Sequence, residues 1–133
     1  MTTDGSVLLD TSVLIALEHL DLSSASDAQP VVSAVTVAEL AFGLDVDDLL
    51  ERQARTDRFY AVVREMTVVP FDLAAARVYG TLAALVRRSG RNPRPRRMDL
   101  QIAATAGARG IPLITRNPAD FVGLEQLVHV IAA

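Results

Sequence analysis

Cysteine and lysine are both absent from this chain, and all 13 of its basic side chains other than histidine are arginines. Without cysteine there is no disulfide framework and no thiolate metal site, which agrees with a reducing compartment, so we expect a cytoplasmic protein. Aspartyl-phosphate phosphatases and response-regulator receivers carry a functional aspartate after their first strand, and both need a lysine near that aspartate. The absence of lysine therefore excludes these two classes.

Long apolar runs are also missing, although hydrophobic residues make up 50% of the 133 positions. Charged residues interrupt the hydrophobic segments of the N-terminal half, so no run is long enough to span a bilayer. The N-terminus lacks the basic start of a secretory signal peptide. We therefore expect no membrane segment, and the length suits a single domain over residues 1–133.

The net charge of −3 argues against a protein that binds nucleic acid through its overall charge. The arginines are nevertheless unevenly distributed. Six of them lie close together: Arg87, Arg88, Arg91, Arg94, Arg96 and Arg97. Arginine suits bidentate contact with phosphate, so this segment is either a local phosphate-binding patch or a solvated loop.

Short apolar segments alternate with longer stretches of helical periodicity. The pattern predicts strands at 7–9, 31–33, 68–70, 112–114 and 127–131, and helices that begin near positions 11, 35, 49, 72 and 98. We expect a surface loop over 21–30, an irregular arginine-rich segment after Gly90, and an amphipathic scaffold helix over 49–64. This alternation predicts an α/β fold with three layers (α/β/α) around a central, mostly parallel sheet of about five strands.

Three carboxylates are each the only charge in a long apolar stretch: Asp10, Glu39 and Asp99. Soluble proteins rarely bury acids without a purpose. Each acid also has a purely structural alternative. Asp10 is placed to cap a helix, and Glu39 stands three residues after Thr36, as in a capping box. Asp99 lies at a helix start, where the helix dipole stabilises an anion.

These acids fall near strand ends or helix starts, where they can converge. Three carboxylates close together repel one another and raise at least one pKa unless a cation neutralises them. An oxygen-only cluster fits Mg²⁺ or Mn²⁺ rather than zinc. The two histidines, His19 and His129, are separated from the acidic stretches and are more typical of surface or satisfied core residues.

Four segments of the chain resemble the signature blocks of PIN-domain ribonucleases. The blocks are 8–15, 36–40, 98–104 and 115–121, and they follow the family's order and spacing over essentially the whole chain. The most similar subgroup is the VapC toxins of bacterial toxin–antitoxin pairs. The resemblance implies a Mg²⁺- or Mn²⁺-dependent endoribonuclease that hydrolyses RNA phosphodiester bonds. It also implies a homodimer and a cognate VapB-type antitoxin that holds the enzyme inactive.

By position, Asp10, Glu39 and Asp99 match the family's acidic metal-site residues, and Thr11 or Ser12 can support the first block. In the proposed mechanism the metal activates a water and offsets developing charge on the phosphoryl group. Asp10 and Asp99 would ligate the ion, while Glu39 would ligate it or position the attacking water.

The fourth block departs from the family pattern. Asn117 stands where many members have an acid, and Asp120 follows three residues later. Asn117 offers a carbonyl or holds a metal-bound water but adds no charge, so a second metal would bind less tightly at Asn117 and Asp120. The alternative is a non-catalytic member that binds RNA or a protein, with Asn117 as a symptom of lost activity.

Four arginines are candidates for binding the RNA backbone: Arg94, Arg96, Arg97 and Arg116. Their contacts would contribute a salt-dependent share of the affinity.

Overall fold

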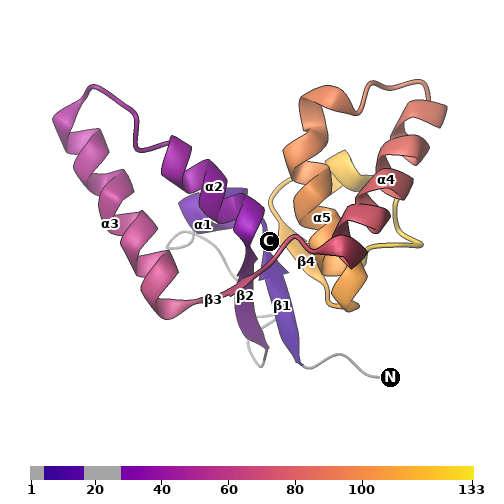
Figure 1. Cartoon of the computed structure of the whole chain (residues 1–133), viewed down its shortest axis with the longest axis horizontal. Coiled ribbons are helices and arrows are strands. Elements are labelled where there is room, and N and C mark those ends of the chain that lie inside the picture. Colours follow the sequence, from indigo (N-terminus) through magenta and orange to yellow (C-terminus); the bar gives the residue numbers. More distant parts are fainter. Residues whose placement is uncertain (1–4, 17–27) are drawn as a thin grey trace.

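Strands and helices alternate along the chain in the computed structural model, which describes residues 5–16 and 28–133 (Figure 1). The strands are β1 (Ser6–Leu9), β2 (Gln29–Ser33), β3 (Thr67–Val69), β4 (Leu113–Thr115) and β5 (Val130–Ala132). The α-helices are α1 (Thr11–Ile15), α2 (Ala34–Phe42), α3 (Leu49–Glu65), α4 (Leu73–Arg88) and α5 (Arg97–Arg109). The described residues also contain two short 3₁₀ turns, η3 (Arg94–Arg96) and η4 (Pro118–Phe121).

The described strands form one sheet in the order β3-β2-β1-β4-β5, and every neighbouring pair is parallel. The predicted α/β class is therefore confirmed. In the centre of the sheet, Leu8 pairs with Val31 on one side and with Leu113 on the other. All four residues of β1 are buried, as expected of a parallel strand covered on both faces.

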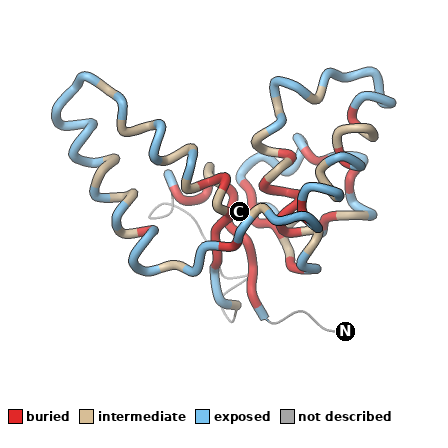
Figure 2. Tube along the Cα trace, in the orientation of Figure 1, coloured by how far each residue is buried: buried red, intermediate tan, exposed pale blue. Residues whose placement is uncertain are grey.

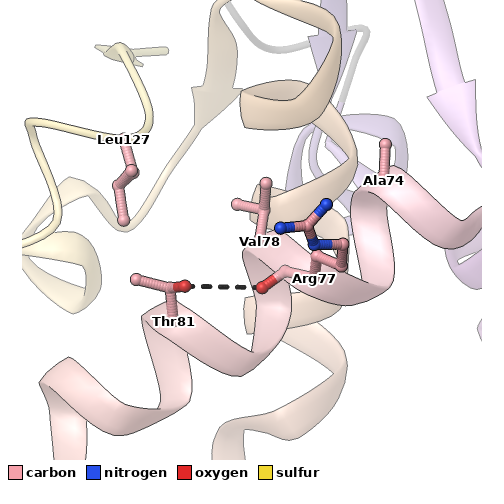
Figure 3. Close-up of a pocket in the computed structure, with 5 residues that line it drawn as sticks. All are labelled: Ala74, Arg77, Val78, Thr81 and Leu127. Carbon is pink, nitrogen blue, oxygen red and sulfur yellow. Dashed lines mark hydrogen bonds between the residues drawn. The ribbon is translucent and has the colours of Figure 1, made fainter.

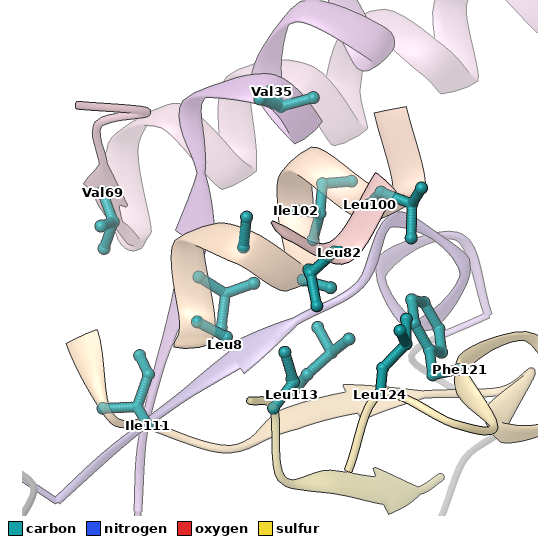
Figure 4. Close-up of a cluster of buried hydrophobic side chains, with 14 of the residues drawn as sticks. Leu8, Val35, Val69, Leu82, Leu100, Ile102, Ile111, Leu113, Phe121 and Leu124 are labelled. Atoms are coloured by element: carbon teal, nitrogen blue, oxygen red, sulfur yellow. The ribbon is translucent and has the colours of Figure 1, made fainter. Parts of the chain in front are cut away.

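Two hydrophobic clusters lie on opposite faces of the sheet, and the alternation of side chains along β1 separates them. Leu8 belongs to the cluster that α4 and α5 cover (Figure 4), whereas Val7 and Leu9 belong to the cluster that α1 and α3 cover. Helix α2 contributes to both, with Val35 in the first cluster and Val37 against the second. Each fully buried Leu or Val contributes about 1.5–3 kcal/mol, so a slip of register would be costly.

Four helices begin with a side chain that accepts a backbone N–H: Asp10, Ser33, Asp48 and Asp72. Such caps satisfy N–H groups that have no partner within the helix. Helix α2 is capped by Ser33 and not by Thr36, so the capping box predicted for Thr36 and Glu39 is wrong. Among the described residues, no helix combines the length and apolar character that crossing a bilayer requires.

Two strand predictions misplace the strand ends. Strand β2 begins at Gln29, inside the predicted loop, and β5 begins at Val130 rather than at residue 127. Leu127 and Val128 are consecutive and both pack on the α4–α5 cluster, whereas consecutive strand residues point to opposite faces. The predicted continuation of the first helix, and most of the loop over 21–30, lie outside the described residues, as does His19.

The arginine-rich segment is more ordered than predicted, because Arg94–Arg96 form the 3₁₀ turn η3 directly before α5. Helix α3 is less amphipathic than predicted. Its first residues Leu49 and Leu50 are 76% and 84% exposed, and Val62 is its buried residue. Most of the helix is exposed or intermediate along its length (Figure 2). Helices α2 and α3 form a hairpin on the side of the molecule away from α4 (Figure 1).

Two glycines in helices provide a matched test of the packing. A Cβ added to Gly107 in α5 would lie 2.7 Å from the carbonyl oxygen of Leu127, while one added to Gly80 in α4 meets nothing within 4 Å. We expect Gly107→Ala to lower the free energy of unfolding by about 1–3 kcal/mol, the usual cost of overpacking. Gly80→Ala should raise it by up to about 1 kcal/mol, because alanine favours helix. Urea denaturation measures both, and equal effects would contradict this packing.

Candidate active site

Strands β1 and β4 are neighbours in the sheet, but the chain leaves β1 toward β2 and reaches β4 from β3. The connections therefore diverge between these two strands. The region at their carboxyl ends, called the crevice below, is the usual place for ligands in open α/β sheets. Asp10 directly follows β1, and Thr115 is the last residue of β4. The strand-end location predicted for Asp10 is confirmed.

Asp10 is 5% exposed, and hydrogen bonds hold both of its carboxylate oxygens. Oδ1 accepts from the backbone N–H of Thr11 at 2.9 Å, as the cap of α1. Oδ2 accepts from Ser12 Oγ at 3.0 Å and from Thr115 Oγ1 at 2.8 Å. Thr115 Oγ1 in turn accepts the N–H of Asn117 at 3.0 Å. A carboxylate has about four acceptor positions, so Asp10 retains about one for a ligand.

Thr115 is a site residue that the sequence analysis did not single out. It is fully buried at the end of β4, and its hydroxyl joins the ends of the two central strands through Asp10. A signal was present, because a buried strand that ends in a polar residue is unusual in a parallel sheet.

Glu39 lies one turn into α2 and reaches the same crevice through Thr11. Thr11 Oγ1 donates to Glu39 Oε1 at 2.7 Å and lies 3.1 Å from the hydroxyl of Thr36, which is fully buried. Thr36 therefore supports the site rather than the end of the helix. The second carboxylate oxygen of Glu39, Oε2, has no hydrogen bond among the described residues and is available to a ligand.

Asp99 lies in the first turn of α5, and its carboxylate accepts no hydrogen bond within the described ranges. Burial raises the pKa of the Asp99 carboxyl above its ordinary value, and the nearby charges of Asp10, Glu39 and Asp120 raise it further, while Arg96 lowers it. The helix dipole would favour an anion here, but burial and repulsion outweigh it. These effects put the Asp99 carboxyl within electrostatic reach of Asp10, Glu39 and Asp120.

The fourth block lies at the same end of the sheet. Asn117 precedes the turn η4, and Asp120 lies within it, with both side chains exposed. Asp120 is close enough to raise the pKa of Asp99, but its own side chain forms no hydrogen bond in the described part of the chain. Asp120 therefore joins the acidic cluster from its outer edge.

The candidate RNA-binding arginines differ in exposure. Arg94, Arg97 and Arg116 are exposed, and Arg97 Nη1 donates to the carbonyl of Arg94 at 3.1 Å. The backbone N–H of Arg116 faces Ser12 Oγ at 3.4 Å. Arg96 is partly buried and lies within electrostatic reach of Asp99. Three of the four candidates are thus exposed to solvent, and Arg96 is the partly buried one.

The acids fit a hard cation by their chemistry, since each offers carboxylate oxygen and the charges repel one another without one. No group of three or more acidic or histidine side chains among residues 5–16 and 28–133 forms a ready metal cage. Mg²⁺ does not need one, because it is usually held by one or two carboxylates and keeps several waters. Asp10 and Asp99 are the carboxylates with oxygen available for such an ion, together with Glu39 Oε2.

Two pockets differ in whether candidate site residues line them. One adjoins the crevice and is lined by Thr11 and Glu39 together with Ile15, Leu40, Gly43, Glu51, Arg55 and Arg58. The other lies on α4 and against Leu127, and its lining, in which Thr81 bonds to the carbonyl of Arg77, contains no acid (Figure 3). The first pocket is therefore continuous with the candidate site, and it adds arginines of α3 that the sequence analysis did not identify.

Known proteins resemble this chain over most of its length. The model of the PIN domain family matches residues 7–122. The chain is 36% identical to ribonuclease VapC5 of Mycobacterium tuberculosis over 132 residues, covering 97% of this chain and 95% of the relative. It is 35% identical to VapC ribonuclease Y4jK of Sinorhizobium fredii over 127 residues, covering 86% and 89%.

Solved structures agree. A chain of the toxin–antitoxin system VapBC-5 from Mycobacterium tuberculosis superposes with a TM-score of 0.78 at 32% identity, covering 96% of this chain and 97% of that one. VapBC-1 from nontypeable Haemophilus influenzae also gives 0.78, at 21% identity and with coverage of 95% and 96%, which shows a shared fold.

The raised pKa of Asp99 predicts a pH-dependent stability effect. A carboxyl group whose pKa is higher in the folded protein destabilises it above the unfolded pKa, and this cost disappears as the pH falls toward the ordinary value of 3.8. With chelator present, Asp99→Asn should therefore raise the Tm at neutral pH, and the gain should shrink on acidification. Thermal unfolding across this range measures it. The exposed Asp57 of α3 supplies a control, and an equal response of Asp57→Asn would contradict the assignment.

Proposed function

Because the chain belongs to the PIN domain family, we propose that it is a metal-dependent endoribonuclease, the VapC-type toxin of a toxin–antitoxin pair. The observation that carries the proposal is the convergence of Asp10, Glu39 and Asp99 at the β1–β4 crevice. The two ribonuclease relatives support the activity, and their similarity extends over most of the chain.

A cluster of carboxylates by itself repels a phosphodiester, since both are anions. We propose that Asp10, Glu39 and Asp99 hold Mg²⁺ or Mn²⁺, with Asn117 and Asp120 as weaker ligands at the outer edge. When bound, such an ion lowers the pKa of a water, polarises the phosphoryl group and offsets its developing charge. A bound cation would also relieve the repulsion that raises the pKa of Asp99.

The roles of this chain's own groups follow from their contacts. Three hydrogen bonds, from Thr11, Ser12 and Thr115, orient the two carboxylate oxygens of Asp10. Glu39 is held at Oε1, which leaves Oε2 to orient the attacking water or accept its proton. Fixing the acids in advance lowers the reorganisation needed during the reaction.

The substrate is RNA in this proposal. We propose that four arginines bind the RNA backbone, although the chain as a whole is acidic. Three lie at or just before the start of α5, and one directly follows β4: Arg94, Arg96, Arg97 and Arg116. Their contribution should weaken with salt, because each phosphate contact releases counterions.

A VapB-type antitoxin is the proposed partner, since similar chains occur in VapBC toxin–antitoxin structures. The turn between α2 and α3 is flanked by Phe42, Leu49 and Leu50, which are 81%, 76% and 84% exposed. Large apolar side chains exposed together are typical of protein–protein interfaces. We propose that the antitoxin covers this hairpin, and we retain the homodimer as a further proposal for sedimentation analysis.

The activity is tested by cleavage of a mixed RNA pool with partner-free protein, with Mg²⁺ or Mn²⁺ and with chelator. We expect metal-dependent cutting that falls at least about 100-fold in Asp10→Asn and Asp99→Asn, since even residues that only support metal ligands cost about 10- to 100-fold. Asp57→Asn is the control, because this exposed acid on α3 bonds only to Gln53 in the described structure.

Two results would overturn the proposal. Cleavage by Asp99→Asn at the wild-type rate would remove the acidic cluster from the reaction. Binding of Mn²⁺ without cleavage of any RNA would favour the non-catalytic alternative, a protein that binds RNA or a partner on the same fold.

The partner surface is tested with Leu50→Glu. Placing a charge in a desolvated apolar contact should weaken binding of the antitoxin encoded beside the gene at least about tenfold, which corresponds to about 1.4 kcal/mol. Leu73→Glu is the matched control, since Leu73 is 78% exposed at the start of α4. Titration calorimetry measures both affinities. RNA cleavage should be unchanged in each variant, and equal loss of affinity would place the antitoxin elsewhere.

A further inference from the structure

The position of Arg96 differs from that of the other candidate RNA-binding arginines. It is the last residue of η3 and lies three residues before Asp99. Its guanidinium carbon lies 5.9 Å from the centre of the Phe121 ring. Phe121 is 3% exposed and follows Asp120 directly in η4. One cation–aromatic contact thus joins the segment that bears Asp99 to the segment that bears Asp120.

The guanidinium of Arg96 is poorly satisfied by the protein. Its Nη2 is shielded from solvent and has no hydrogen-bond partner, and the side chain forms no ion pair within the described residues. A buried donor on a charged group without a partner is unfavourable. Stacking on an aromatic face occupies the face of the guanidinium but none of its N–H donors. Arg96 therefore has hydrogen-bonding capacity that no group in the described part of the chain uses.

The charges around Arg96 indicate that an anion would satisfy its unused hydrogen-bond donors. Of the charged groups that act on Asp99, three are acids and Arg96 is the cation. The exposed Arg97 differs, because its guanidinium already donates to the carbonyl of Arg94. A ligand that enters the crevice must bring its own oxygen acceptors to Arg96, since the carboxylates nearby form no ion pair with it.

We propose that Arg96, held against Phe121, contacts the non-bridging oxygens of the scissile phosphate. The inference rests on the proposed ribonuclease function. In hydrolysis the water oxygen bonds to phosphorus, the bond from phosphorus to the leaving ribose oxygen breaks, the water gives up a proton and the leaving oxygen gains one. Arg96 transfers no proton, because guanidinium stays charged in proteins. It stabilises the negative charge on the non-bridging oxygens, which its planar donor fork matches.

The test compares Arg96→Gln with Arg97→Gln on an RNA oligonucleotide that the wild type cleaves. For Arg96→Gln we expect kcat to fall on the order of 100-fold with KM changed only a few-fold, as for other donors to transition-state charge. For Arg97→Gln we expect the opposite division, a higher KM with a nearly unchanged kcat. Arg96→Lys should recover part of the rate, since it keeps the charge but not the fork.

Two further measurements separate substrate contact from a structural role. Mn²⁺ binding without RNA should be as tight or tighter in Arg96→Gln, because a neighbouring cation has been removed. Phe121→Leu keeps an apolar side chain but removes the ring. It should lower kcat in the wild-type background and have little further effect in the Arg96→Gln background.

The outcomes distinguish this inference from the function on which it rests. A wild type that binds Mn²⁺ but cleaves no RNA overturns both. A wild type that cleaves RNA, with Arg96→Gln equally fast, overturns only the role of Arg96. If Arg96→Gln folds poorly, which a lowered Tm would reveal, Arg96→Lys becomes the deciding variant. A wild-type kcat in folded Arg96→Lys would then overturn the bidentate contact.

Discussion

Repulsion between carboxylates that the fold holds close together is the constraint on which the functional end of this protein depends. Burial and the charges of Asp10, Glu39 and Asp120 all raise the pKa of Asp99. The hydroxyls of Thr11, Ser12 and Thr115 hold Asp10 and Glu39 in place. A cluster of carboxylates that repel one another, and that hydrogen bonds nevertheless hold in place, indicates a functional site rather than a contribution to stability.

The sheet supplies the energy that keeps these acids together. Strands β1 and β4 are buried on both faces, and the two hydrophobic clusters fix their register, so Asp10 and Thr115 meet at one edge. The helices divide the remaining tasks. Helices α4 and α5 cover the larger cluster, and the start of α5 carries Asp99 directly after Arg96 of η3. The α2–α3 hairpin lies on the other side of the molecule (Figure 1), and its turn is flanked by exposed apolar side chains.

Much of the fold could be predicted because its signals are local. Val7–Leu9 is a continuous apolar segment, and helical periodicity begins near positions 49 and 72, so the strand and the starts of both helices are close to the prediction. The errors arose where long-range contacts decide. Leu127 and Val128 resemble a strand but pack together on the α4–α5 cluster, and Leu49 and Leu50 resemble a buried face but remain exposed.

The sequence by itself singled out three acids, because isolated carboxylates in apolar stretches are costly and their spacing matches a known family: Asp10, Glu39 and Asp99. Only the tertiary structure decided how they are held. The bond from Thr115 to Asp10 spans 105 positions, and the contact of Arg96 with Phe121 joins two separate turns. No local pattern encodes either contact, because both depend on how segments distant in the sequence are arranged in the folded protein.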